Sequence, residues 1–294
     1  MNICFCINDS YVDILKICMF SILENNEDVN INFYIFSSFL SNESKNKLNQ
    51  IQEKFNNCKI VYQVINNDIF TNFKLNIDYI SIETYYRYII ADILTNIDKI
   101  LYLDADTIIN GNLKDLYDTD IENYYCAGVK DLYIEKINHK YNIGLNNSNT
   151  YINAGVLLLN LKKLREDTIS KLLFEKTKEL EEIIKYQDQD IINIVFKNKI
   201  KYLDSIYNYA GTNMHKEWKK HKHAIIIHYT GPQKPWLPKC HNKLRKIWKK
   251  YDKYFSKVIL NKNDSHEFII LIFCIFLFII WIINFILMIK PLYE

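Results

Sequence analysis

The sequence has few glycines and prolines, six and four among its 294 residues. It contains neither a GxGxxG fingerprint nor a P-loop, which excludes the two common glycine-rich loops that hold phosphate groups. A ligand with phosphate groups would therefore need another grip, and a metal ion is the natural substitute. Three of the prolines fall within the stretch HYTGPQKPWLP, which predicts a stiff loop.

The charge and cysteine patterns exclude further classes of protein. The formal net charge of +3 is too small to favour nucleic-acid binding by bulk electrostatics, so we expect no nucleic-acid partner. The seven cysteines form no paired CxxC pattern and are typical of reduced thiols in a cytosolic domain. The first residues, MNICFCIND, enter an apolar strand pattern without the features of a secretory leader, so we expect the domain to remain in the cytoplasm.

Strand and helix patterns alternate over the first hundred residues. The apolar runs NICFCI, INFYIFS, KIVYQVI and KILYLD are typical of strands, and helical periodicity occupies residues 11–23, about 41–56 and 81–94. Repeated βα units predict an α/β fold with a mainly parallel central sheet and helices on both faces. In such sheets, ligands bind beyond the carboxyl ends of the strands.

Two acidic side chains, Asp104 and Asp106, follow the strand pattern KILYLD. At this spacing in extended backbone, both carboxylates project from one face and can share a divalent cation, although a solvated turn would show the same letters. His228 ends a second strand pattern, AIIIHY, and could add an imidazole ligand suited to Mn²⁺, although a histidine at a strand end is often only structural. We predict that Asp104, Asp106 and His228 bind Mn²⁺ or Mg²⁺.

Two metal-dependent reactions use such a carboxylate pair. The text DxDxT also occurs in haloacid-dehalogenase-like phosphatases, but here it lies beyond residue 100 and no GDxxxD-like element follows it. The other reaction is transfer from a nucleotide-sugar, in which a metal neutralises charge on the departing diphosphate. Gly231 and Lys234 fit this second reaction, because glycine lets the backbone approach a phosphate and lysine supplies a positive charge.

Several ordered blocks of the sequence resemble the family 8 retaining glycosyltransferases, especially the bacterial lipopolysaccharide α-galactosyl- and α-glucosyltransferases, with glycogenin as a more distant relative. The blocks cover about residues 1–240 and are FCINDSYV, ISIETYYRYIIADIL, DKILYLDADTIINGNLKDLYDTD, YINAGVLLLNLKKLR, YQDQDI and IHYTGPQKPW. The resemblance implies a GT-A catalytic domain over residues 1–240. It also implies transfer of galactose or glucose from UDP-galactose or UDP-glucose to a glycan or glycolipid acceptor such as lipopolysaccharide.

The resemblance also implies roles for single residues. Asp131, Asp188 and Gln189 are the catalytic candidates, and Gln189 would lie near the reacting carbon. An adjacent carboxylate and amide can hold sugar hydroxyls, and an arginine can bind phosphate in a bidentate manner. The candidates for substrate binding are Asn8, Asp9, Tyr11, Arg87, Asn153, Ala154, Gly231 and Lys234.

Two positions depart from the family pattern. Relatives commonly have an acidic residue in place of Asn8 and a larger polar residue in place of Ser10. An amide oxygen can still accept from the uracil N3–H, so the preference for uridine is weakened rather than lost. The alternative to an enzyme is a membrane-tethered protein that binds nucleotide or glycan without turnover.

The C-terminal part of the sequence has a different character. Residues 268–289, FIILIFCIFLFIIWIINFILMI, would form a helix about 33 Å long, enough to cross a bilayer, and a buried core helix is the alternative. We predict a single C-terminal membrane anchor. Only Lys290 follows this run, whereas many basic residues precede it, which predicts a catalytic domain on the cytoplasmic face, in a bacterium that of the inner membrane. The preceding basic residues are Lys239, Lys243, Arg245, Lys246, Lys249, Lys250, Lys253, Lys257 and Lys262.

Residues 241–266 link the domain to this run and have a basic amphipathic pattern. Apolar side chains recur there at helical spacing, with lysines on the remaining face. We predict a helix that lies on anionic lipid, although a helix packed on the catalytic domain would show the same periodicity. The apolar positions are Leu244, Ile247, Trp248, Tyr251, Phe255, Val258 and Ile259.

Overall fold

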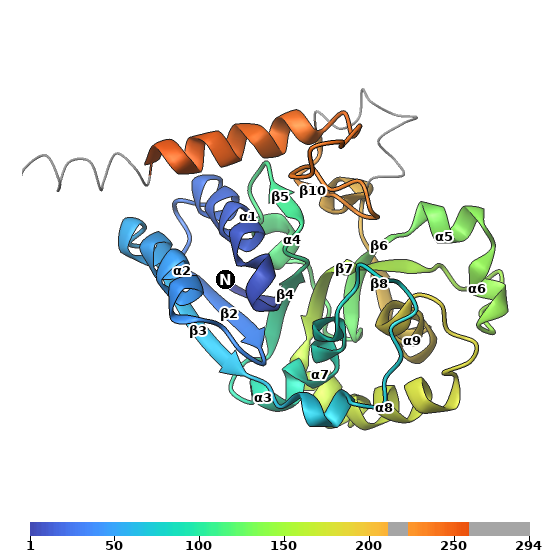
Figure 1. Ribbon diagram of the computed structural model, residues 1–294. Coiled ribbons are helices and arrows are strands. Elements are labelled where there is room, and N and C mark those ends of the chain that lie inside the picture. Colours follow the sequence, from blue (N-terminus) through green and yellow to red (C-terminus); the bar gives the residue numbers. More distant parts are fainter. Residues whose placement is uncertain (211–222, 259–294) are drawn as a thin grey trace, which may run out of the picture. The chain divides into compact units, whose positions relative to one another are not determined.

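The computed structural model describes residues 1–210 and 223–258 (Figure 1). A seven-stranded sheet runs through the unit Met1–Tyr251 in the order β3-β2-β1-β4-β7-β6-β8. Its strands are β1 (Asn2–Cys6), β2 (Ile31–Ser37), β3 (Cys58–Val64), β4 (Lys99–Leu103), β6 (Cys126–Lys130), β7 (Ile152–Asn160) and β8 (Ile200–Tyr202).

The prediction of a mainly parallel sheet holds for the N-terminal half. Strands β1 to β4 are parallel to their neighbours in this half, and β6 is parallel to β8. Strand β7, however, is antiparallel to both β4 and β6. The sheet is therefore mixed, because β7 enters between two strands of the opposite direction.

Helices cover both faces of the sheet. Helices α1 and α2 lie side by side on one face, and α8 and α9 lie on the other (Figure 1). The predicted helix over residues 81–94 is instead a 3₁₀ helix followed by a short α-helix. The helices within residues 1–210 are η1 (Asp9–Tyr11), α1 (Val12–Glu24), α2 (Asn42–Lys54), η2 (Asn67–Phe70), η3 (Ile82–Ile89), α3 (Ile90–Ile93), α4 (Lys114–Tyr117), α5 (Leu132–Lys136), α6 (His139–Asn142), α7 (Leu161–Glu166), α8 (Ile169–Glu179), α9 (Gln187–Phe196) and η4 (Ser205–Tyr207).

The core explains the long apolar runs. Residues Ile152 to Leu159 of β7 are all buried, since this strand lies inside the sheet with both faces covered. A strand buried on both faces shows a continuous apolar run rather than alternation. On β4, Ile100 and Tyr102 belong to the same buried cluster as Leu173 of α8 and Ile192 of α9.

A second, three-stranded sheet was not predicted. It consists of β5 (Thr107–Ile109), β10 (Ile226–His228) and β9 (Tyr209–Ala210), with β10 in the middle. Strand β10 is antiparallel to β5, and its register sets His228 opposite Thr107. This pairing brings the histidine next to the two aspartates that precede β5.

The predicted amphipathic segment at 241–266 contains a helix at residues 245–258. Leu244, Trp248 and Tyr251 are buried in the unit Met1–Tyr251, and the Tyr251 hydroxyl accepts from Asn25 Nδ2 at 2.9 Å. The rings of Trp248 and Trp236 lie 5.9 Å apart. These apolar side chains pack within the compact unit, which continues to Tyr251.

None of the helices in residues 1–210 and 223–258 is long and apolar enough to cross a membrane. The predicted anchor at 268–289 lies outside the described residues.

Candidate active site

A cavity of about 750 Å³ opens beyond the carboxyl ends of β1 and β4, at the edge of the sheet where the sequence predicts ligands. Two predicted residues are not in its lining. The Asp9 carboxylate accepts from the Ser41 backbone N–H at 2.8 Å, and its role in substrate binding stays a prediction. The second is Ala154, whose backbone N–H donates to Gln189 Oε1 at 2.9 Å. The other predicted residues all line the cavity: Asn8, Tyr11, Arg87, Asp104, Asp106, Asp131, Asn153, Asp188, Gln189, His228, Gly231 and Lys234.

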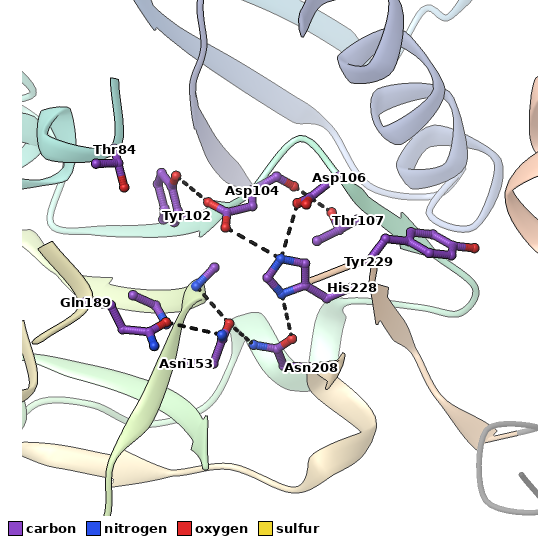
Figure 2. A network of polar contacts seen from close by, with 12 residues as sticks. Thr84, Tyr102, Asp104, Asp106, Thr107, Asn153, Gln189, Asn208, His228 and Tyr229 are labelled. Atoms are coloured by element: carbon purple, nitrogen blue, oxygen red, sulfur yellow. Dashed lines mark hydrogen bonds and ion pairs between the residues drawn. The ribbon is translucent and has the colours of Figure 1, made fainter. Parts of the chain in front are cut away.

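Asp104, Asp106 and His228 converge in this cavity (Figure 2). Nε2 of His228 lies 3.2 Å from Asp106 Oδ1 and 3.5 Å from Asp104 Oδ2. One ligand atom from each of the three residues lies within 4.8 Å of the others. Ligand atoms about 2.1 Å from one ion and at right angles to each other are about 3 Å apart, so the arrangement fits a divalent cation.

The backbone of β7 and β10 sets these distances. Asp104 N–H donates to the Gly155 carbonyl at 2.8 Å, and Tyr229 N–H donates to the Asp106 carbonyl at 3.0 Å. A Cβ on Gly155 would lie 2.5 Å from Asp104 Oδ2 and would collide with the His228 ring. Only glycine at this position lets β7 pass so close to the ligands.

Neighbouring polar groups orient the metal-binding candidates. The Tyr102 hydroxyl donates to Asp104 Oδ1 at 2.7 Å, and His228 Nδ1 lies 3.0 Å from Asn208 Oδ1. Such outer contacts fix ligand rings and carboxylates in known metal sites. The three residues and their surroundings therefore fit a divalent metal ion.

Lys234 lies beside the same carboxylates. Its ammonium donates to Asp106 Oδ2 at 2.5 Å and to the Tyr229 carbonyl at 2.9 Å. Burial alone would raise the pKa of Asp106, but Lys234 and His228 outweigh burial and hold that pKa well below its usual range. Gly231, which lines the cavity, has a φ of 77°, a left-handed backbone conformation that favours glycine. A buried ammonium group next to a metal site can bind the phosphate oxygens of a diphosphate.

Arg87 and Asp188 form a buried pair on the other side of Asp104. Nε of Arg87 lies 2.8 Å from Asp188 Oδ2, and its Nη1 lies 3.8 Å from Asp104 Oδ1. The guanidinium also faces the Tyr102 ring, 4.6 Å from the ring centroid. Burial raises the pKa of Asp188 to about 6, although Arg87 opposes this shift. Asp188 sits in the first turn of α9 and does not cap that helix.

Gln189, Asn153 and Asp131 form a cluster of amides and a carboxylate. Gln189 Oε1 accepts from the Ala154 backbone N–H at 2.9 Å and from Asn153 Nδ2 at 3.2 Å. Asp131 Oδ2 accepts from Asn153 Nδ2 at 3.1 Å, while Oδ1 caps α5 through Tyr133 N–H and Ile134 N–H. The cluster lines the cavity with fixed donors and acceptors that can bind hydroxyl groups.

Sequence reasoning missed four residues of this region. Tyr102 lies two residues before Asp104, and this strand spacing is the signal that could have identified it. Glu83 is a buried acid within the helical block, 5% exposed, next to Asn8. Gly155 and Asn208 carry no local signal, because their importance depends on contacts between distant segments.

The family model described as Glycosyl transferase family 8 matches residues 2–240. The chain belongs to glycosyl transferase family 8. Relatives of this family 8 chain include a putative glycosyltransferase of Haemophilus influenzae, 37% identical over 82% of this chain and 74% of the relative. A lipopolysaccharide 1,2-glucosyltransferase of Escherichia coli K12 is 27% identical over 80% of this chain and 72% of the relative.

A solved structure agrees with the family assignment. The crystal structure of the galactosyltransferase LgtC with donor and acceptor sugar analogues has a TM-score of 0.78 and 30% identity to this family 8 chain, and the match covers 86% of this chain and 96% of LgtC. The predicted GT-A-like α/β fold and the enzyme class, a hexosyltransferase, are confirmed. The DxDxT phosphatase alternative is therefore set aside.

Proposed function

We propose that this family 8 enzyme transfers galactose or glucose from a UDP-sugar, with retention of anomeric configuration, to a hydroxyl of a glycan acceptor. The observation that carries the proposal is the convergence of Asp104, Asp106 and His228 in one cavity with the cations Arg87 and Lys234. The names of the E. coli relative and of LgtC support glucose and galactose as the transferred sugars.

Each group of residues has a distinct task in this proposal. Asp104, Asp106 and His228 would hold Mn²⁺ or Mg²⁺, and the bound ion would neutralise negative charge on the departing diphosphate. Lys234 forms an ion pair with Asp106 in this structure, and its ammonium can instead pair with a phosphate oxygen when the sugar donor binds. Asp188 and Asn153 would accept from and donate to the sugar hydroxyls.

We infer that Gln189 acts as a binding group rather than as a nucleophile. Its side chain is an amide, and its oxygen already accepts from Ala154 N–H and Asn153 Nδ2. A neutral amide with an engaged oxygen is a poor nucleophile for a covalent intermediate. We favour attack of the acceptor on the same face as the leaving diphosphate, whose oxygen takes the acceptor proton.

Glu83 supports uridine as the base of the donor. Its carboxylate is buried at the cavity wall, and Oε2 lies 3.4 Å from Asn8 Nδ2. A carboxylate can accept the uracil N3–H, and the neighbouring Asn8 amide can donate to a uracil carbonyl. The pair offers the acceptor that Asn8 alone supplies less well.

The proposed acceptor is a lipid-linked glycan, and the proposed location of the enzyme is a membrane surface. We assign the acceptor to lipopolysaccharide or another glycolipid, in line with the name of the E. coli relative. The apolar run 268–289 would anchor the enzyme on the cytoplasmic face of a membrane, in a bacterium the inner membrane. Enzyme and acceptor on one surface meet at a high effective concentration.

UDP release tests the proposal. Full-length protein receives UDP-galactose or UDP-glucose with Mn²⁺ and a glycolipid acceptor, and the Asp106→Asn variant and a metal-chelated sample serve as controls. We expect release with one of the two donors and a loss of about 100-fold or more in both controls. Donor binding without any release would favour the tethered binding protein, and an inverted product anomer would contradict retention.

A further inference from the structure

Asn208 is a buried amide between the metal-binding candidates and the sugar-binding amides. It lies just before β9, is 1% exposed, and does not line the cavity. Figure 2 shows its side chain between the His228 ring and Asn153. Nothing in its immediate sequence marks it, since His228 follows 20 residues later.

A chain of hydrogen bonds fixes the orientation of each amide. The backbone N–H of Gly155 can only donate, and it donates to Asn153 Oδ1 at 3.0 Å. Asn208 Nδ2 donates to the same oxygen at 2.9 Å. The other atom of the Asn208 amide, Oδ1, therefore faces His228 Nδ1 at 3.0 Å.

This orientation determines which ring nitrogen of His228 carries a proton. An amide oxygen opposite Nδ1 requires Nδ1–H, since an oxygen cannot donate. In the neutral ring, the other nitrogen, Nε2, then carries the lone pair, and it faces Asp104 and Asp106, where a cation could bind it. A histidine ligand in a metal site commonly has its second N–H held in this way.

The same amide reaches the sugar-binding cluster. Asn208 occupies Asn153 Oδ1 together with Gly155 N–H, so the Asn153 Nδ2 group points to Asp131 Oδ2 and Gln189 Oε1. At the far end, Ala154 N–H holds Gln189 Oε1 at 2.9 Å. The backbone at Ala154 and Gly155 thus orients both Gln189 and, through two asparagines, His228.

We propose that Asn208 is a positioning residue that holds His228 with its proton on Nδ1 and couples the metal site to the amides around Gln189. The part that concerns the cation rests on the proposed function, whereas the Nδ1–H bond is a property of the protein itself. A merely structural role would instead be limited to satisfying buried hydrogen bonds.

The Nδ1 proton can be observed directly. Full-length protein with ¹⁵N-labelled histidine is examined by NMR without metal and with Mg²⁺ alone, and the His228→Gln variant identifies the signal. We expect a protected His228 Nδ1–H resonance in both states, because the group is buried and hydrogen-bonded. Asn208→Leu removes the acceptor and should abolish this protection, whereas Asn208→Asp keeps an oxygen and should retain it.

Mn²⁺ affinity, measured from the paramagnetic resonance of free Mn²⁺, provides a readout independent of turnover. We expect Asn208→Leu to weaken Mn²⁺ binding by about 10- to 100-fold and Asn208→Asp to stay within about threefold of the parent protein. Asn26→Leu is the matched control, because Asn26 is also 1% exposed and its side chain bonds the backbone of Ile22 and Leu113. It should lower thermal stability without a change in Mn²⁺ affinity.

Turnover separates the effect of Asn208 on the metal site from its effect on the amides around Gln189. At saturating Mn²⁺, Asn208→Asp should lower kcat by about 10-fold with little change in the KM for the UDP-sugar. The reason is that the variant can no longer donate a hydrogen bond to Asn153 Oδ1. An unprotected Nδ1 in the parent protein, or Mn²⁺ affinity that is unchanged in Asn208→Leu, would overturn the proposal. If Asn208→Leu does not fold, the Asn208→Asp data and the parent spectrum still decide it. Failure of UDP release in the parent protein would leave the proton and affinity results unaffected and would count against the proposed function alone.

Discussion

At the scale of single residues, Gly155 shows how an absent side chain shapes the site. Strand β7 passes so close to Asp104 and His228 that a Cβ would fall within 2.5 Å of the carboxylate. The conflict involves Asp104, directly after β4, and His228, at the end of β10, and the backbone of each residue is paired with a neighbouring segment. The space for a metal ion is therefore set partly by the backbone of β7.

We predict that Gly155→Ala weakens Mn²⁺ binding by about 10-fold or more, since it displaces two ligands at once. Isothermal titration with Mn²⁺ and UDP measures the effect. Gly111→Ala is a suitable control, because its Cβ would lie 3.4 Å from the Ile225 side chain, an ordinary van der Waals contact. Equal Mn²⁺ affinity in the two variants would show that the ligands accommodate the methyl group.

Glu83 is a second residue whose place in the cavity wall, beside Asn8, only the structure shows. We predict that Glu83→Leu raises the KM for the UDP-sugar by about 10-fold, because it removes a charged acceptor from the cavity wall. The advantage of UDP over ADP as an inhibitor should shrink as well. Glu83→Gln keeps an oxygen and should have a smaller effect. An unchanged ratio of UDP to ADP inhibition in Glu83→Leu would place base recognition elsewhere.

At the scale of elements, the helix at 245–258 is part of the catalytic unit as far as Tyr251. The Tyr229 hydroxyl donates to the Leu244 carbonyl at 2.9 Å, directly after His228 in the chain. The helix therefore supports the strand that carries a metal-binding candidate. The amphipathic pattern alone did not distinguish between lipid and protein as the partner of its apolar face.

We predict that Trp248→Ala destabilises the protein by about 3 kcal/mol, because Trp248 is 8% exposed and packs against Trp236. Lys249→Ala, on the exposed face, should change the stability by less than about 0.5 kcal/mol. A chain that ends at residue 240 should melt well below one that ends at residue 258. Equal melting temperatures of these two chains would show that the helix contributes nothing to the domain.

At the scale of the whole molecule, the catalytic unit and the apolar C-terminal run differ in character. The lysines at 246, 249 and 250 are exposed on the helix, where they can still interact with anionic lipid. Such an interaction is screened by salt, whereas insertion of an apolar helix is not. Salt dependence therefore separates the two modes of membrane binding.

We predict that the full chain stays with anionic vesicles during flotation in about 1 M salt, where the Debye length is about 3 Å. A chain that ends at residue 258 should float with the vesicles only at low salt. Release of the full chain by high salt would argue against an anchor at 268–289. Retention of the shorter chain in high salt would instead locate an apolar membrane contact on the catalytic unit.

The sequence by itself determined the βα strands, the residues of the DxD pair, His228 and the family. Apolar runs and helical periods are local, and a motif carries its side chains with it, so these features need no knowledge of distant contacts. Asp104 and Asp106 could be paired with His228 from chemistry and resemblance, before any strand pairing was known.

Only the tertiary structure decided the direction of β7, the pairing of β5 with β10, and the partners of Asp9, Glu83, Gly155 and Asn208. Each of these depends on the register between segments that lie far apart in the chain. A hydrogen-bond ladder sets that register, and periodicity within one segment carries no information about it. For the same reason, the amphipathic pattern at 245–258 established an apolar face but not the surface that covers it.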